Sequence, residues 1–340
     1  MHPDASFRIG TGVAVRDVTR YPEWLETAEA AGFDLLTTGD SQSLWAEPFV
    51  SKTMAAALTS RPDLAITVSN PMTRHPAVVA SACLALQQLS GGRFRYGIGS
   101  GDSALRNIGT RPARVDEIEA YIRAVKDLCA GREAEWGGSR FGVHWHEAPT
   151  PVWIAAEGPR TQELAGRIAD GVILSNCLEP GMRQVAYANI RRGCEAAGRR
   201  FEELEIWFMC NLVPAASEAE GIDSVKAILA GTANHVYRFH MEGKGLPEDV
   251  KPKIAELERR YDSRHHASPA TAAHNAALVD ELSLVDFLAP LGTLAGPPER
   301  LVERLQEVVA SGARNLILSQ FVEDEIGFMR LLADEVLPNV

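Results

Sequence analysis

The chain has 340 residues, of which 46% are hydrophobic, so it is long enough for two average domains or for one large α/β barrel. Its formal net charge is −11 and its basic residues are dispersed, which argues against a nucleic-acid partner because phosphate binding needs a concentrated basic surface. The five cysteines are scattered without a C-x-x-C pair, which argues against a disulfide framework or a structural zinc site.

Short apolar runs rich in β-forming residues alternate with segments of helical period. In chain order the runs predict eight strands, at 7–15, 35–38, 64–69, 94–99, 152–156, 171–174, 205–213 and 315–320. The segments between and after them predict helices at 22–31, 47–58, 77–89, 115–130, 161–169, 181–197, 298–310 and 323–336. Residues 132–145 predict a small hairpin with Gly137-Gly138 as its turn.

Eight βα steps in succession indicate a parallel sheet, and the count fits a (β/α)₈ TIM barrel that forms a single domain over residues 1–340. The alternative is an open, doubly wound sheet. Residues 226–286 interrupt the pattern with a mostly helical stretch that is too long for an ordinary barrel connection. Such insertions tend to form lids or substrate walls, so we expect this one to cover the active site.

The amino-terminal residues lack a basic segment followed by a long apolar run, and no stretch offers ~18 uninterrupted apolar residues. These features predict neither a secretory signal nor a membrane span. Together with the unpaired cysteines they favour a cytoplasmic protein.

TIM barrels place their chemistry at the carboxyl ends of the strands. The segments found there are "TTGDSQSLW", "SNPMTRHP", "GSGDSALR", "AAEGPRTQE", "SNC" and "CNLV". They are rich in Gly, Ser, Thr, Asn and Asp and hold no cluster of metal-ligand type. The sequence therefore predicts a site built for hydrogen bonding, without a metal. Large apolar side chains near these ends, about half of which we expect to touch a ligand, are Trp45, Phe49, Met72, Trp153, Phe208 and Met209.

Four segments together resemble the bacterial-luciferase-like superfamily of flavin-dependent oxidoreductases, most of all its deazaflavin branch, typified by methylenetetrahydromethanopterin reductase. The segments are "AEAAGFDLLTTGD", "VSNPMTRHPAVVASACLALQQLSGGRFRYGIGSGD", "AAEGPRTQELAGRIADGVILSN" and "GPPERLVERLQEVVASGARNLILS". They span most of the chain in the family's order.

The resemblance implies a bulge with a non-prolyl cis peptide at Thr67-Val68, followed by Ser69 and Asn70, beneath the central ring of the cofactor. A cis bond without proline is uncommon and is found mainly at functional sites. The residues alone favour a simpler interpretation, in which Asn70-Pro71 initiates a turn at the end of an ordinary strand.

The resemblance also implies three further cofactor-binding segments. Their residues are Gly99, Ser100, Gly101 and Asp102 after the fourth strand, Glu157, Gly158, Pro159 and Arg160 after the fifth, and Ser175 and Asn176 after the sixth. A helix N-terminus after Gly158 would bind a phosphate, with Arg160 as its charged partner. A turn, an ordinary capped helix and a polar strand end are the alternative interpretations of these three segments.

For catalysis the resemblance points to Asp40, where the deazaflavin branch usually carries Asp-His and this chain has Asp40-Ser41. Serine cannot replace imidazole as an acid or base near neutral pH. The Arg74-His75 pair could supply the function, although His75 stands before a proline at a helix start. Four further histidines, His235, His240, His265 and His266, lie in the insertion.

The expected function is hydride transfer between coenzyme F420 and a small organic substrate. The first alternative is an FMN-dependent monooxygenase that uses oxygen and a separate flavin reductase, and the second is a non-catalytic flavin-binding protein. An unrelated barrel enzyme would need a catalytic Lys or Glu at a strand end, and none is evident in the sequence. The family further implies a homodimer.

Overall fold

A computed structural model describes residues 7–237, 240–262, 269–319, 322 and 324–340. Eight parallel strands form a closed barrel: β1 (Arg8–Val13), β2 (Leu35–Thr38), β3 (Asp63–Ser69), β4 (Phe94–Ile98), β7 (Val152–Ala155), β8 (Gly171–Leu174), β9 (Glu205–Pro214) and β11 (Asn315–Ser319). Pairing of β8 with β9 closes the ring. The predicted TIM barrel is therefore confirmed, and the open-sheet alternative is wrong.

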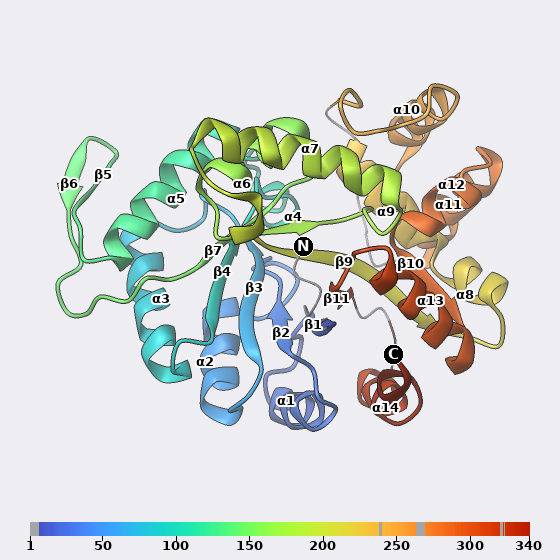
Figure 1. Cartoon of the computed structure of the whole chain (residues 1–340), viewed down its shortest axis with the longest axis horizontal. Coiled ribbons are helices and arrows are strands. Elements are labelled where there is room, and N and C mark those ends of the chain that lie inside the picture. The colour runs from blue at the N-terminus through green and yellow to red at the C-terminus, as the bar shows by residue number, and fades with distance from the viewer. Residues whose placement is uncertain (1–6, 238–239, 263–268, 320–321, 323) are drawn as a thin grey trace.

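The helices that cover the barrel follow the predicted order closely (Figure 1). They are α1 (Tyr21–Ala30), α2 (Pro48–Leu58), α3 (Pro76–Ser90), α5 (Val115–Cys129), α6 (Pro159–Ile168), α7 (Pro180–Ala196), α13 (Pro298–Ala310) and α14 (Glu325–Leu331). The last predicted helix is shorter than expected, because a π-helical turn at Leu332–Val336 follows α14. Six of these helices carry proline in their first turn, where its missing N–H costs nothing, namely α1, α2, α3, α6, α7 and α13.

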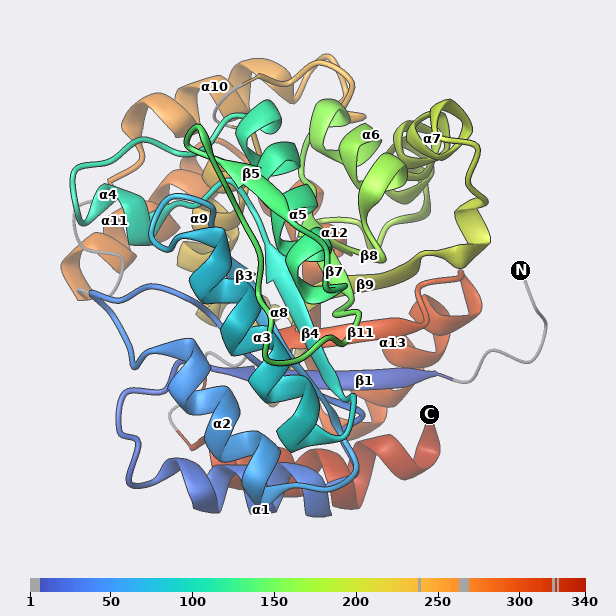
Figure 2. The same ribbon diagram turned by 90° about the vertical axis from the view of Figure 1, so that its left-hand side faces the viewer.

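Two further features flank the barrel. The expected hairpin forms from β5 (Ala134–Trp136) and β6 (Ser139–Phe141), with Gly137-Gly138 at positive φ in the turn. It lies beside α5 and away from the other strands in Figure 1, and Figure 2, viewed from that side, shows it in front of the barrel. A strand that the sequence did not predict, β10 (Thr293–Gly296), pairs with the carboxyl end of β9.

The barrel interior is filled by apolar side chains from alternate strand positions. Leu35, Ala65, Trp153, Ile173, Trp207 and Ile317 form a buried cluster of their own. Their neighbours Leu36, Leu64 and Val172 belong to the larger core beneath the helices instead, as the two-residue period of a strand requires. Val68, Ala155 and Met209 pack onto the inner cluster and form the floor on which the site stands.

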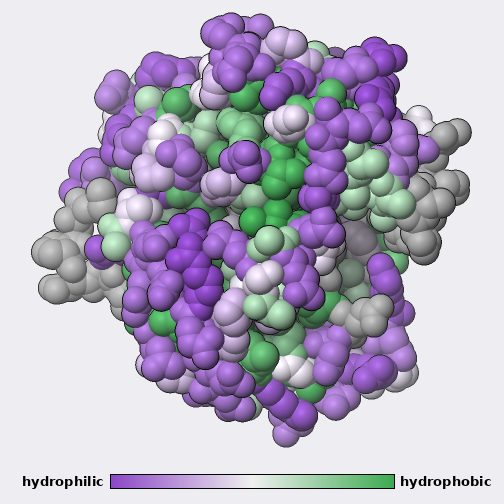
Figure 3. Space-filling view, turned by 90° about the vertical axis from the view of Figure 1, so that its right-hand side faces the viewer, coloured by the Kyte–Doolittle hydropathy of each residue, from purple (hydrophilic) through white to green (hydrophobic). Residues whose placement is uncertain are grey.

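The insertion consists mainly of α9 (Lys226–Tyr237), α10 (Lys251–Arg260), α11 (Pro269–Glu281) and α12 (Val285–Gly292), preceded by the short α8 (Glu218–Ser224). These helices share a second hydrophobic core, with Leu229, Ala233, Ile254, Val279 and Leu288 among its buried residues. The outer surface on this side of the molecule is largely hydrophilic, with hydrophobic side chains in the hollow between its lobes (Figure 3). No helix in the described part of the chain is both long and apolar enough to cross a membrane.

Helices α6 and α7 cross at two glycines. A Cβ on Gly166 would lie 2.1 Å from the carbonyl oxygen of Ile190, and a Cβ on Gly193 would lie 2.0 Å from that of Glu163. Both distances are far below van der Waals contact, so only glycine permits the two backbones to come this close. This close crossing fixes the position of α6, whose N-terminus faces the site described next.

Candidate functional site

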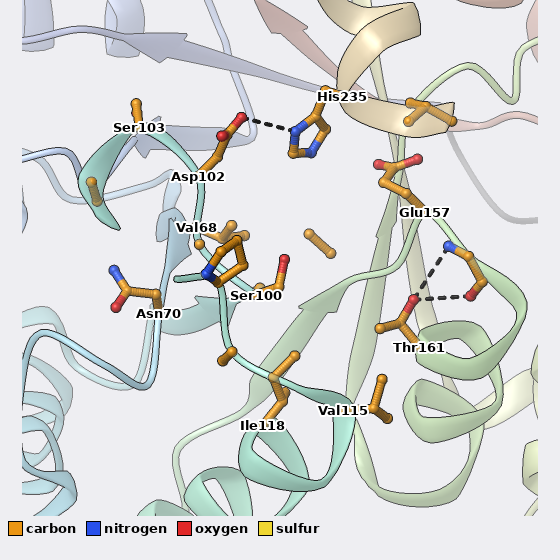
Figure 4. Close-up of a pocket in the computed structure, with 18 of the residues that line it drawn as sticks. Val68, Asn70, Ser100, Asp102, Ser103, Val115, Ile118, Glu157, Thr161 and His235 are labelled. Carbon is orange, nitrogen blue, oxygen red and sulfur yellow. Dashed lines mark hydrogen bonds and ion pairs between the residues drawn. The ribbon is translucent and has the colours of Figure 1, made fainter. Parts of the chain in front are cut away.

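A cavity of about 630 Å³ opens at the carboxyl ends of β2, β3, β4 and β7. Its lining comes from the loops after these strands, from the start of α5 and α6, and from α9 of the insertion (Figure 4). No group of three or more His, Cys, Asp or Glu side chains that could hold a metal occurs among the described residues.

The end of β3 forms one wall of this cavity. The peptide bond between Thr67 and Val68 is cis, and the register with β4 shifts between Ile66 and Ser69. The side chain of Val68 occupies the space where Gly99 lacks a Cβ, since a Cβ there would lie 3.1 Å from Val68 Cγ2. Thr67, Val68 and Gly99 all line the cavity. The bulge and its fit against β4 are therefore present as the resemblance implied.

Asn70 also starts a turn, as the sequence interpretation of Asn-Pro proposed. Its Oδ1 accepts hydrogen bonds from the backbone N–H of Met72 at 3.0 Å and of Thr73 at 3.1 Å. The two interpretations of this strand end are thus compatible, because the bulge precedes the turn. The turn directs Arg74 back toward β2.

Asp40, at the end of β2, is held by that arginine. Its side chain is 0% exposed, and both carboxylate oxygens accept hydrogen bonds from the Arg74 guanidinium. Ser69 Oγ donates a further bond of 2.6 Å to Asp40 Oδ2. These three donors make Asp40 an anchor between the β2 and β3 loops. Asp40 also lines the cavity, and its catalytic role stays a prediction.

Ser41 is likewise committed to a loop contact. Its Oγ lies 2.9 Å from Ser103 Oγ in the short helix α4 (Ser103–Arg106), and the neighbouring Gln42 donates to the Ala104 carbonyl at 2.7 Å. These bonds join the loop after β2 to the loop after β4. Ser41 lines the cavity, but its hydroxyl already has a partner.

The N-terminus of α6 forms the opposite end of the cavity. Gly158 is the N-cap, Pro159 occupies the first turn, and Thr161 Oγ1 bonds both the N–H and the carbonyl of Gly158. The Arg160 side chain is exposed at the cavity edge and has no ion-pair or hydrogen-bond partner in the described part of the chain. A free guanidinium beside unpaired helix N–H groups is a suitable site for an anion.

Two further cationic or titratable side chains from the insertion approach this end. Lys244 and His240 line the cavity, and a Cβ on Gly158 would lie 3.5 Å from Lys244 Cε and 3.5 Å from His240 Cε1. Lys244 is buried, and its Nζ donates to the Val236 carbonyl. Lys244 of the insertion therefore adds positive charge near the N-terminus of α6.

A smaller cavity of about 320 Å³ adjoins the first on the barrel axis. It is lined from β7, β8, β9, β11 and α9, by residues that include Ser175, Asn176, Met209, Asn211 and Thr232. Five residues line both cavities: Thr67, Val68, Ala155, Glu157 and His235. The two spaces thus meet at the cis bond.

The junction of the cavities is spanned by a contact between the barrel and the insertion. His235 Nδ1 of α9 lies 3.1 Å from Asp102 Oδ2 in the loop after β4, as Figure 4 shows. The other carboxylate oxygen of Asp102 forms an ion pair of 2.9 Å with Arg106. The contact holds α9 over the site.

Most of the predicted site residues surround one or the other cavity. Those that do not are Ser69, which is buried and bonded to Asp40, and Pro159, which begins α6. His75 is also outside: its Nδ1 accepts the backbone N–H of Ala77 at 3.2 Å as the cap of α3, and its ring packs against Phe141. The prediction that His75 takes part in catalysis is not supported by this position.

Several lining residues escaped the sequence interpretation, chiefly Pro112, Ala113, Arg114, Val115, Asp116, Ile118 and Lys244. They belong to the segment before α5, to the start of α5 itself and to the insertion, where no strand end marks them. Of the apolar candidates, Trp45 and Met209 line the cavities, whereas Trp153 and Phe208 are buried in the core. His235 and His240 line the first cavity, and His265 and His266 lie outside the described residues.

Comparisons with known proteins agree with this geometry. The chain is 27% identical to 5,10-methylenetetrahydromethanopterin reductase of Methanopyrus kandleri over 346 residues, which cover 94% of this chain and 95% of the relative. It is 26% identical to F420-dependent glucose-6-phosphate dehydrogenase of Beutenbergia cavernae, with 96% and 94% covered.

Solved structures share the fold. The coenzyme F420 dependent tetrahydromethanopterin reductase of Methanopyrus kandleri superposes with a TM-score of 0.76 at 22% identity, covering 98% of this chain and 99% of that one. A long-chain alkane monooxygenase gives a TM-score of 0.67 at 15% identity, with 98% and 91% covered. The model of the luciferase-like monooxygenase family matches residues 5–315. The chain therefore belongs to the luciferase-like monooxygenase family, whose named members among these matches are enzymes.

Proposed function

We propose that this chain is an oxidoreductase that uses the deazaflavin coenzyme F420 to move a hydride to or from a small organic molecule. The observation that carries the proposal is that the larger cavity connects two features of the site. It extends from the Thr67–Val68 bond to the N-terminus of α6, where Arg160 has no partner among the described residues. A ring system and a phosphate on one ligand would occupy these two ends together.

The residues present fit such a cofactor. Trp45 lines the cavity, and its indole Nε1–H is buried without a hydrogen-bond partner in the described structure, so it can donate to a ring carbonyl. Arg160 and the first N–H groups of α6 suit a phosphate. Val68 and Ala155 offer a flat apolar support between these groups.

When bound, F420 supplies the position that accepts or donates the hydride. The chain's own task is to hold substrate against that position and to keep water away. The floor of Val68, Ala155 and Met209 over a filled barrel prevents access from below, and α9 covers the site from the side of the insertion. The glucose-6-phosphate dehydrogenase named as F420-dependent, aligned over 96% of the chain, supports this choice of cofactor.

A fluorescence titration tests the proposal, because Trp45 stands in the cavity and should be quenched by a bound ring. We expect saturable quenching by F420 and a weaker response to FMN. Tight binding of FMN and none of F420 would refute the choice of cofactor. It would favour instead the FMN-dependent monooxygenase. The family name and the fold shared with the alkane monooxygenase are the observations that support this alternative.

Two further outcomes are distinguishable. Binding of F420 without turnover of any substrate would favour a non-catalytic flavin-binding protein. Oxygen consumption with reduced FMN, supplied by a flavin reductase, would identify the monooxygenase.

We also propose that the chain forms a homodimer through α2 and α3. These adjacent helices expose large apolar side chains, namely Val50 at 55%, Leu58 at 54%, Val78 at 60% and Leu89 at 49%. Exposed apolar side chains gathered in one area are typical of an interaction surface. Light scattering after gel filtration checks the mass, and Val50→Asp with Val78→Asp should shift a dimer to monomer while F420 binding persists.

A further inference from the structure

His235 occupies a position that the function above leaves without a role. Among the described residues, five line both cavities, and of these His235 alone comes from the insertion; the others are Thr67, Val68, Ala155 and Glu157. In Figure 4 its ring reaches from α9 to a place between Asp102 and Glu157. A group at this junction would touch both a ring in the larger cavity and a molecule in the smaller one.

We propose that His235 is the residue that moves the substrate's proton, that Asp102 positions its ring, and that the substrate is an uncharged alcohol or carbonyl compound held in the smaller cavity. This inference rests on the proposed function, because it assigns the proton that accompanies hydride transfer.

The contact with Asp102 determines which ring nitrogen is available. A carboxylate only accepts hydrogen bonds, so the 3.1 Å contact requires the proton of a neutral imidazole to be on Nδ1. Nε2 then keeps its lone pair and can accept a proton. Asp102 is itself held by Arg106 at 2.9 Å, so the carboxylate is oriented from both sides.

The other candidates for this task are engaged elsewhere. Asp40 is enclosed by Arg74 and Ser69, and Ser41 is bonded to Ser103. His75 caps α3 outside the cavity. The insertion therefore brings to the junction the imidazole that the β2 end of this chain does not carry.

The chemistry of the smaller cavity indicates the substrate class. Among its described lining residues no Lys or Arg occurs, and the one carboxylate is Glu157. Burial raises the pKa of the Cys210 thiol to about 12, so this thiol is neutral. Asn176, Asn211, Thr232 and Ser319 provide neutral hydrogen-bonding groups. A phosphate or carboxylate would find no Lys or Arg among these described residues and would be repelled by Glu157, whereas a hydroxyl or carbonyl would find partners.

The proposed step balances. In the oxidising direction, the O–H proton of an alcohol passes to Nε2 of His235. The hydrogen on the neighbouring carbon leaves with both electrons as hydride to the oxidised F420, and the C–O bond becomes C=O. In the reducing direction the imidazolium returns its proton to the carbonyl oxygen as hydride arrives from the reduced cofactor.

One experiment without cofactor tests the arrangement of the ring. Long-range proton–nitrogen NMR spectra of histidine-labelled protein at alkaline pH report which nitrogen carries the proton. We expect His235 to be protonated at Nδ1 in the parent protein and to become a mixture of tautomers in Asp102→Asn. A parent ring protonated at Nε2 would overturn the assignment.

Kinetics then separate catalysis from folding. With 2-propanol or cyclohexanol as the probe and F420 absorbance as the readout, His235→Gln should lower kcat by about 10²–10⁴-fold. Its Kd for F420, measured by fluorescence, should stay within about twofold, because Gln keeps the size and the contact with Asp102. Imidazole added to His235→Ala should restore part of the lost rate. The matched control is His274→Gln, an exposed histidine on α11 of the same insertion that bonds the Arg260 carbonyl, which should behave as the parent.

The substrate class is tested by charge. Neutral alcohols and ketones should react, whereas glucose 6-phosphate and lactate should not. Turnover of the charged probes alone, or an undiminished kcat in His235→Gln, would overturn the inference while leaving F420 dependence intact. Absence of F420 binding would instead refute the proposed function, and the NMR result would still decide the geometry of the pair.

Discussion

Asp40 and Arg74 form a buried bidentate ion pair that ties the end of β2 to the turn after β3. The Asp40 side chain is 0% exposed and that of Arg74 is 17% exposed. Arg74 also reaches Glu47 at 2.7 Å, at the N-cap of α2, so one guanidinium joins three loops of the site. The pair therefore holds the wall that contains the Thr67–Val68 bond.

Removing the carboxylate should destabilise the protein. In Asp40→Ala, Arg74 loses its buried partner and keeps only the more exposed Glu47, so we expect a loss near the lower end of the about 3–5 kcal/mol that breaking a buried pair costs. Urea denaturation should show this loss in the free energy of unfolding. Glu47→Gln is the control. The Glu47 side chain is 41% exposed, so losing its ion pair with Arg74 should lower the free energy of unfolding by less than about 1 kcal/mol. Equal costs in the two variants would contradict the anchoring role.

Arg160→Ala should weaken F420 binding. A charge-assisted bond from its guanidinium to a phosphate is worth about 1.5–3 kcal/mol, and the free arginine has no other partner among the described residues to lose. Fluorescence titrations at two salt concentrations would show lower affinity and a weaker salt dependence. Arg167→Ala, at the other end of α6 and paired with Glu119, should leave the affinity unchanged. An unaltered Kd in Arg160→Ala would place the phosphate elsewhere.

Lys52 gives the fold a dependence on pH. It is fully buried in α2, where its Nζ donates to the Leu36 carbonyl at 2.9 Å, and desolvation lowers its pKa to about 7. The unfolded chain keeps the ordinary pKa of about 10.4, so between these values the unfolded state binds more protons than the folded state. Stability therefore rises as pH increases through this window, and below pH 7 the full cost of the buried charge is present.

The size of this effect follows from the same shift. Between pH 7 and pH 9 the lysine should add about 2 kcal/mol to the free energy of unfolding. Lys52→Met should remove this increment, and its advantage over the parent should shrink as pH rises. Denaturation at both pH values checks the slope. Parallel pH profiles for the two proteins would show that the ammonium is not desolvated in this way.

Gly193→Ala should strain the crossing of α6 and α7. The new Cβ would lie 2.0 Å from the Glu163 carbonyl oxygen, so the helices must separate. Overpacking of this kind costs typically about 1–3 kcal/mol, and it should displace the α6 N-terminus. We expect a lower melting temperature together with weaker F420 binding. A variant with the parent's melting temperature would show that the crossing tolerates a methyl group.

Much of the barrel was predictable because its signals are local. A buried strand such as 171–174 is a continuous apolar run, and a helix such as 115–130 shows its period within a few turns. Strand β10 was missed because it directly continues from α12 without a turn signal. The end of the last helix was misjudged because a π-helical turn keeps an almost helical pattern of apolar residues.

The site was predictable in part for the same reason. Segments at the ends of strands, such as those holding Asn70 and Arg160, are located by the barrel rule alone. Whether a polar residue there faces a cavity or a neighbouring side chain depends on partners far along the chain. Asp40 was assigned to catalysis, but Arg74, 34 residues away, takes up its carboxylate.

The sequence by itself determined that the chain is an eight-stranded barrel, and its motifs carried the resemblance to the luciferase-like family. Hydrophobic periodicity and turn residues are local features of the sequence, so they can be identified without knowledge of the fold. The tertiary structure alone decided which titratable groups meet. His235 joins Asp102 across 133 positions of the chain, and no local pattern encodes a contact that arises only when the insertion packs over the barrel.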